Sequence, residues 1–305
     1  ALEIRQAGHE FDKMRKRILR HLNQRTEMLS GISHDLRTPL TRMKLQIAFI
    51  KDEELAKKLT EELLVANPNE VFLYNLLGLI LSELKKIDQA IECYNKGLKI
   101  DSTYSMLYNN IAQLLFSYKY NGNQKKIEEY FKKSISLNKK IPEPHNNLGN
   151  FYKANNNFNE AILCFKESLK INNNFYFAHH NLATTYVTLG KYNEAKAHFF
   201  DAIKIFPNFY NAHRSLSRII KYDKNNEHFL QLVDIHKNLN LNKNSDKMLI
   251  GYSLGKAYED IGDFDKSFAH YKEANESQNK DNDFSLKETR KYFENIKNTF
   301  NKDIL

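Results

Sequence analysis

The sequence predicts an all-α protein: a solenoid, coiled as a right-handed superhelix of helix pairs, that follows a different N-terminal segment. An internal repeat indicates this, because the pattern of residues 146–152 recurs at residues 180–186, with a period of 34. After the first copy come Ala161 and, four residues beyond it, the aromatic Phe165, and both marks recur after the second copy. Composition agrees, since 10 glycines, 5 prolines and no tryptophan in 305 residues favour helices over strands.

This pattern, with a small residue beside a leucine in the first helix, resembles the tetratricopeptide repeat (TPR). The resemblance covers residues 67–281 and implies about six repeats that act as a binding scaffold. Repeat two has three extra residues in its turn, near residues 120–123, and the second helix of repeat five, near 228–239, lacks the alanine and aromatic marks. The small, leucine and aromatic positions are predicted to be core.

Residues 1–20 form a predicted amphipathic helix, with Ala7, Phe11, Met14 and Ile18 at helical spacing. Their sequence resembles the closing helix of a HAMP signalling linker. That resemblance implies a position just inside the membrane of a bacterial receptor.

The next segment, residues 29–43, places the imidazole of His34 beside the carboxylate of Asp35, with Thr38 four residues on and Pro39 behind it. Asp35 can hold or deprotonate the ring and leave one nitrogen free to attack a phosphoryl group. The segment resembles the H-box of a sensor histidine kinase, in its dimerisation and phosphoacceptor (DHp) domain. The resemblance implies that His34 is the phosphoacceptor, Asp35 its acid/base partner, and Thr38 a residue that positions water.

The DHp hairpin, assigned to residues 21–66, is expected to be truncated, because after about Glu62 the sequence runs into a segment that ends like the second helix of a TPR. No glycine-rich nucleotide lid follows, so no cofactor is expected in this chain, and ATP would act only through a kinase domain in trans. The same resemblance implies two partners: a second copy of the chain, paired through the N-terminal helices, and a response regulator that docks on them.

Eight polar residues are expected on the concave side of the first helices. An asparagine carries both a donor and an acceptor, so a ladder of them can bind the backbone of an extended peptide. A similar ladder occurs in the TPR superhelix of the protein O-GlcNAc transferase. The alternative is that asparagine is a filler in an Asn-rich chain. The predicted groove residues are Asn75, Asn109, Asn110, Asn146, Asn147, His180, Asn181 and Arg214.

Three histidines, His145, His179 and His213, recur with the same period as the repeat and could suggest a metal array. They are interpreted as packing residues, and no metal site is predicted, because no carboxylate or cysteine is seen to complete a ligand set. Cys93 and Cys164 are expected to be small buried hydrophobes without a disulfide.

The net charge of +9 comes from lysines scattered over many helices, so nucleic acid is not predicted as a partner. No run of 18 apolar residues is present, so no membrane span is expected, and a cytoplasmic location fits.

Residues 251–275, with a polar linker and a helix at 289–300, resemble the junction of TPR-sulfotransferase proteins. Residues 282–305 would then lead to a missing transferase domain, and no phosphate-binding glycine loop is seen in this chain. Three functions follow: first, a TPR interaction scaffold fused to a phosphoacceptor segment; second, a sensor histidine kinase fragment that relays phosphate through His34. The third is the N-terminal TPR part of a sulfotransferase, joined artefactually to the kinase segment.

Overall fold

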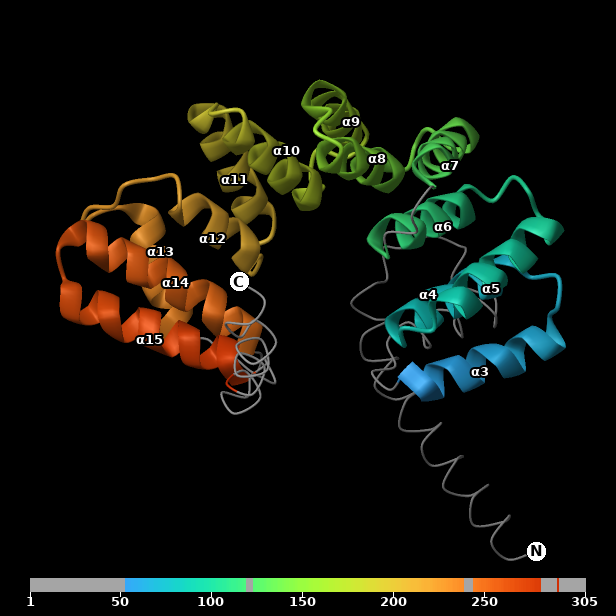
Figure 1. The fold of residues 1–305 in the computed structure, drawn as a ribbon, viewed down its shortest axis with the longest axis horizontal. Helices are drawn as coiled ribbons and strands as arrows, with labels where there is room; N and C mark the ends of the chain where they lie inside the picture. Colours follow the sequence, from blue (N-terminus) through green and yellow to red (C-terminus); the bar gives the residue numbers. More distant parts are fainter. Residues whose placement is uncertain (1–52, 119–122, 239–243, 281–289, 291–305) are drawn as a thin grey trace, which may run out of the picture. The chain divides into compact units, whose positions relative to one another are not determined.

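The computed structural model describes residues 53–118, 123–238, 244–280 and Arg290, and all regular secondary structure in this part of the chain is helical (Figure 1). The all-α prediction is therefore confirmed. The HAMP-like helix, His34, Asp35, Thr38 and most of the C-terminal linker lie outside the described residues. The chain forms two compact units, residues 1–100 and 101–305, and each is described by itself. Among the described residues, no helix combines the length and the apolar character needed to cross a membrane.

The described part of unit one, residues 53–100, contains three helices: α3 (Glu53–Ala66), α4 (Val71–Glu83) and α5 (Ile87–Ile100). The described residues of unit two contain the other helices: α6 (Ser105–Ser117), α7 (Gln124–Leu137), α8 (Pro142–Ala154), α9 (Phe158–Ile171), α10 (Tyr176–Thr188), α11 (Tyr192–Ile205), α12 (Tyr210–Ser217), α13 (Glu227–Asn238), α14 (Asn244–Ile261) and α15 (Phe264–Lys280).

The helices pack as hairpins, α4 with α5, α6 with α7, α8 with α9, α10 with α11 and α14 with α15. The tight turns of the other four hairpins, apart from α6 with α7, use a left-handed residue, as at Asn156 (φ 62°) and, at the same position of the next repeat, Gly190 (φ 72°). Glycine reaches this conformation without strain. The longer connection between α6 and α7 accommodates the three extra residues expected in repeat two.

The core of each hairpin joins a small residue of the first helix to an aromatic ring of the second. In repeat three, Ala161 and Phe165 are fully buried. A Cβ atom built on Gly149 would lie 2.6 Å from Cε1 of Phe165, so the two helices approach too closely for a larger residue in this arrangement. The predicted core positions are thereby confirmed.

Helix α3 continues the repeat pattern upstream. It has 14 residues, as α5 does, and it precedes α5 by one repeat period. Its buried residues Ala56 and Thr60 stand at the positions of Ala90 and Tyr94 in α5. Leu59 and Leu63 add to the apolar contact between α3 and α4. Helix α3 thus packs as the second helix of a repeat and passes Glu62 without a break.

Repeat five departs from the pattern because its first helix, α12, has only eight residues. The chain from Arg218 then turns back so that Tyr222 becomes buried, and its backbone N–H donates to the Asp260 carboxylate at 2.9 Å. Helix α13 fills the seam with Phe229 and Leu232 in place of the missing alanine and aromatic residue.

Candidate functional site

The asparagines of three consecutive first helices form one hydrogen-bonded row, called here the asparagine ladder. Asn147 Nδ2 donates to Asn109 Oδ1 at 3.0 Å, which joins α8 to α6. Asn181 Nδ2 donates to Asn146 Oδ1 at 2.9 Å, which joins α10 to α8. Within each helix the neighbours are also linked, Asn109 to Asn110 at 3.0 Å and Asn146 to Asn147 at 3.4 Å. The structure therefore brings together five of the eight predicted groove residues.

Burial divides the ladder into an inner and an outer part. Asn109 and Asn146 are 4% and 5% exposed, and Asn110 is also buried, whereas Asn147 and Asn181 are half-buried. An amide nitrogen carries two hydrogens, and the ladder uses one from each outer residue. Each bond between adjacent first helices joins an outer amide nitrogen to an inner amide oxygen, so inner and outer residues together hold the helices in place. Asn75 is buried in unit one.

His180 continues this first-helix face beyond the ladder. Its Nε2 lies 3.2 Å from Ser215 Oγ on α12, and its ring packs edge-on against Phe209 at 5.1 Å. Burial lowers the pKa of His180 to about 4, so the ring is neutral at pH 7. A neutral ring offers one donor and one acceptor, as an asparagine does.

Aromatic rings gather beside His180, where α10 and α12 begin. The Tyr176 ring lies 4.9 Å from both Phe206 and Phe209, and Phe177 lies 5.5 Å from Phe209. Phe177 and Phe206 remain 43% and 40% exposed. These rings give the first-helix face an apolar border.

Two half-buried cations stand on the first helices. Lys153 Nζ donates to Thr184 Oγ1 at 2.6 Å, and burial lowers the pKa of Lys153. The Arg214 guanidinium lies 5.2 Å from the centre of the Tyr252 ring, and burial, then the charge of Arg218, lowers the pKa of Arg214. Among the described residues, neither cation forms an ion pair with a carboxylate.

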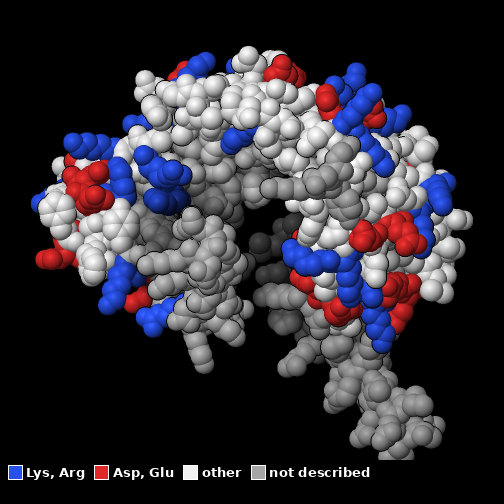
Figure 2. Space-filling model, viewed as in Figure 1, with Lys and Arg blue, Asp and Glu red and all other residues white. Residues whose placement is uncertain are grey.

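Arg214 is one of the groove residues predicted from the sequence, whereas Lys153 is not. The available signal was helical spacing, because Lys153 follows Asn146 by seven residues and so shares its face of α8. Elsewhere the charges mix: Figure 2 shows Lys and Arg next to Asp and Glu over the viewed face.

The repeated histidines occupy the same position in successive repeats, and two of them have polar neighbours that the sequence did not indicate. The ring of His213 is fully buried, and its Nε2 lies 2.9 Å from the carbonyl oxygen of Pro207. Its Nδ1 lies 2.9 Å from His228 Nε2, and His228 Nδ1 lies 2.8 Å from the Tyr222 hydroxyl. The Pro207 carbonyl can only accept, so His213 donates from Nε2 and accepts at Nδ1 from Nε2 of His228. His228 in turn accepts at Nδ1 from the Tyr222 hydroxyl, and both rings are neutral. Burial lowers the pKa of His228 to about 3.

His179 lies in a different setting, with His198 and Asp201 of α11 beside it. The sequence does not place a carboxylate near this histidine, because Asp201 is distant from it along the chain, on the next helix. The helix hairpin brings the three side chains together.

The two cysteines are buried or half-buried thiols without a disulfide. Cys93 Sγ donates to the Tyr74 carbonyl at 3.3 Å. Burial raises the pKa of Cys93 to about 12 and that of Cys164 to about 11, so both thiols are protonated at pH 7. The prediction of a small buried hydrophobe is confirmed for Cys93, whereas Cys164 is only half-buried.

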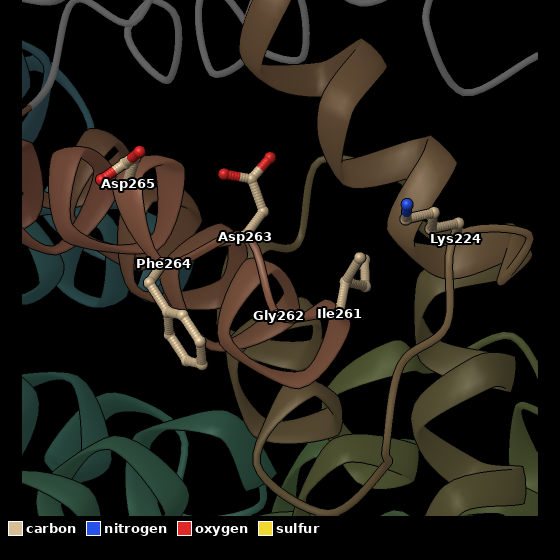
Figure 3. A pocket seen from close by; sticks show the side chains of 6 residues that line it. All are labelled: Lys224, Ile261, Gly262, Asp263, Phe264 and Asp265. Atoms are coloured by element: carbon tan, nitrogen blue, oxygen red, sulfur yellow. The ribbon is translucent and has the colours of Figure 1, made fainter.

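A surface hollow of about 420 Å³ lies at the turn between α14 and α15 (Figure 3). Figure 3 shows Asp263 and Asp265 on one side of this turn and Phe264 on the other. A hydrogen bond from Lys266 lowers the pKa of Asp263, so this carboxylate is part of an ordinary surface ion pair. The hollow is lined by Lys224, Ile261, Gly262, Asp263, Phe264 and Asp265.

The tetratricopeptide-repeat family matches residues 71–104, 142–175, 164–197 and 252–281. The chain carries tetratricopeptide repeats. Solved structures share the fold: TTC0263, a thermophilic TPR protein of Thermus thermophilus, is 18% identical, with a TM-score of 0.52 over 58% of this chain and 95% of that chain. The Cut9–Hcn1 hetero-tetramer of APC/C has a TM-score of 0.56 at 18% identity, over 81% of this chain and 46% of that chain.

One curated relative matches a short part of this chain. The sensor histidine kinase GtrS of Pseudomonas aeruginosa is 43% identical over 63 residues, which are 21% of this chain and 13% of GtrS. The chain therefore spans only a small part of that relative.

Proposed function

We propose that the TPR array binds an extended, acidic peptide segment of a partner protein across its first-helix face. The observation that carries this proposal is the pair of half-buried cations, Lys153 and Arg214, that have no carboxylate partner among the described residues. Lys153 lies on α8 and Arg214 on α12. Helix α10, which carries His180 and the ladder residue Asn181, is the first helix between these two along the chain.

The chemistry of the face suits such a ligand. A half-buried cation has lost part of its hydration, and a carboxylate that pairs with it makes a charge-assisted hydrogen bond. The outer amides of Asn147 and Asn181 would bond to the peptide backbone, whatever its side chains. The exposed rings of Phe177 and Phe206 would accept an apolar residue at one end of the segment.

Binding of the full chain to an array of extended peptides tests the proposal. Peptides rich in Asp or Glu should be enriched over basic and neutral ones. Replacing one of the two cations, in Lys153→Gln or Arg214→Gln, should weaken binding by roughly 10- to 100-fold, since a hydrogen bond to a charged group contributes about 1.5–3 kcal/mol.

The matched control is Lys166→Gln, which removes an exposed lysine from the second helix α9. It should leave the affinity unchanged. Equal affinity in all variants, or an equal loss in the control, would contradict the assignment of the binding face.

A second candidate function rests on the match to a sensor histidine kinase. Its 63 residues are close in number to the segment ahead of the first full repeat, which holds the H-box residues His34, Asp35 and Thr38. We propose on this basis that His34 accepts a phosphoryl group from a kinase domain in trans and passes it to a response regulator. Incubation with a phospho-donor kinase should label the wild type and His145→Ala but not His34→Ala. Labelling of all three proteins would exclude this role.

A further inference from the structure

Three potential metal ligands converge between α10 and α11. Nδ1 of His179 and Nδ1 of His198 lie 3.0 Å apart. Oδ2 of Asp201 lies 3.6 Å from His179 Nδ1 and 3.7 Å from His198 Nδ1. We propose that His179, His198 and Asp201 form a binding site for a divalent transition-metal ion of the Zn²⁺ type.

The spacing of the three atoms suits such an ion. Zinc binds imidazole nitrogen and carboxylate oxygen at about 2.0–2.2 Å, which places neighbouring ligand atoms of a tetrahedral site about 3.3–3.5 Å apart. The observed triangle of 3.0, 3.6 and 3.7 Å brackets that range, so only small side-chain adjustments would bring all three atoms into the first coordination shell. Two imidazoles and one carboxylate on one face are also a ligand set that leaves positions open on the metal.

The outer contacts orient the rings for this role. His179 Nε2 lies 3.0 Å from the backbone oxygen of Asn173, which can only accept, so Nε2 carries the hydrogen and Nδ1 presents its lone pair. A hydrogen bond from the second ring nitrogen to a backbone carbonyl is a common support for metal-binding histidines. Without an ion, His198 must donate from Nδ1 to His179. A shift of that proton to Nε2 of His198 would free the second ligand.

The helix geometry explains why these residues meet. His198 and Asp201 are three residues apart on α11 and so share one face of that helix. His179 comes from the first helix of the same hairpin and is only 4% exposed, which fixes its position. The corresponding residues of repeat three are His145, Cys164 and Glu167, and they do not form such a group within the described part of the chain.

An ion could reach this site from solvent. The side chain of Asp201 is 51% exposed, and the same residue lines a hollow of about 340 Å³ together with Phe200, Lys204 and Glu227. The open positions on the metal would therefore hold water or a side chain of a partner. An ion here would cross-link α10 to α11.

A second group, His236, His270 and Glu273, also holds its ligand atoms within 4.8 Å of one another and would compete for metal in a titration. The experiment therefore uses the full chain, free of any histidine tag, in a Glu273→Gln background. Titration with Co²⁺, followed by its visible d–d absorption and then by displacement with Zn²⁺, should show one site per chain.

In that background, Asp201→Asn and His198→Gln should each weaken Co²⁺ binding by at least roughly 10- to 100-fold, the loss known for supporting residues of metal sites. His145→Gln, which removes a half-buried histidine from the preceding repeat, should bind as the background does. Circular dichroism checks that each variant folds, and Asp201→Asn is expected to fold because its side chain is half exposed. Absence of Co²⁺ binding in the folded background protein, or equal affinity in all variants, would overturn the site.

Discussion

The close approach of Gly149 to the Phe165 ring predicts a specific energetic coupling between these two residues. A Cβ at residue 149 would meet three ring atoms of Phe165, at 2.6, 2.8 and 3.0 Å. Gly149→Ala therefore forces the buried ring to move, at a cost of about 1–3 kcal/mol for overpacking. The same change adds about 0.8–1 kcal/mol of helix propensity, because alanine is the better helix former.

The net effect of Gly149→Ala in the wild type is therefore a loss of about 0–2 kcal/mol in the free energy of unfolding. Phe165→Leu removes the ring and costs less than the ~3–5 kcal/mol of a truncation to alanine. In the Phe165→Leu protein the clash is absent, so Gly149→Ala should stabilise by about 0.8–1 kcal/mol. The cycle thus predicts a coupling of about 1–3 kcal/mol between the two positions.

Urea unfolding of the four proteins, followed by far-UV circular dichroism, measures this coupling. Repeat four provides a control, because Ala183 stands at the position of Gly149 and already carries a Cβ in the core that it shares with Phe199. Ala183→Gly should cost about 1 kcal/mol whether residue 199 is Phe or Leu. A coupling below about 0.5 kcal/mol between residues 149 and 165 would refute the reasoning, since independent sites add to within that margin.

Three further predictions concern the polar interior. Neutral His180, with its pKa lowered to about 4 against about 6.5 when unfolded, contributes stability that is present above pH 6.5 and lost as the pH falls toward 4. The free energy of unfolding should drop between pH 7 and pH 5. His180 should account for a part of this drop on the order of 1–2 kcal/mol, and that part should be missing in the His180→Gln protein. Tyr222→Phe leaves Nδ1 of His228 without its 2.8 Å donor, so it should lower the free energy of unfolding, measured by thermal unfolding, by about 1–3 kcal/mol. The control Tyr192→Phe, at an exposed tyrosine, should leave it unchanged. Asn146→Ala breaks two bonds of the asparagine ladder and should also cost about 1–3 kcal/mol in urea unfolding, while Asn150→Ala on the same helix should be nearly neutral.

The repeat period could be read from the sequence because each repeat solves the same packing problem. The small residue, the alanine and the aromatic ring recur wherever two helices approach closely, as at Gly149, Ala161 and Phe165. The ladder positions were also predictable, since they follow from their place on the first helix. Their mutual hydrogen bonds were not, because side-chain partners 35 or 38 residues apart depend on the rotation between successive repeats.

Other features depended on tertiary contacts that periodicity does not encode. Asp201 and His198 meet His179 only through the hairpin, and Tyr222 is buried because α12 ends after eight residues. Helix α3 shows the opposite case: Ala56 and Thr60 already stand at repeat positions in the sequence, but these residues were predicted to belong to the DHp hairpin. The boundary expected near Glu62 lies inside this continuous helix, and the DHp assignment of residues 21–66 remains a prediction.

The most direct test of the proposed binding face is amide hydrogen exchange of the full chain with and without a bound acidic peptide. We expect added protection in the first helices α8, α10 and α12, and little change in the second helices α9 and α11. Protection confined to α9 and α11, with α8, α10 and α12 unchanged, would contradict it.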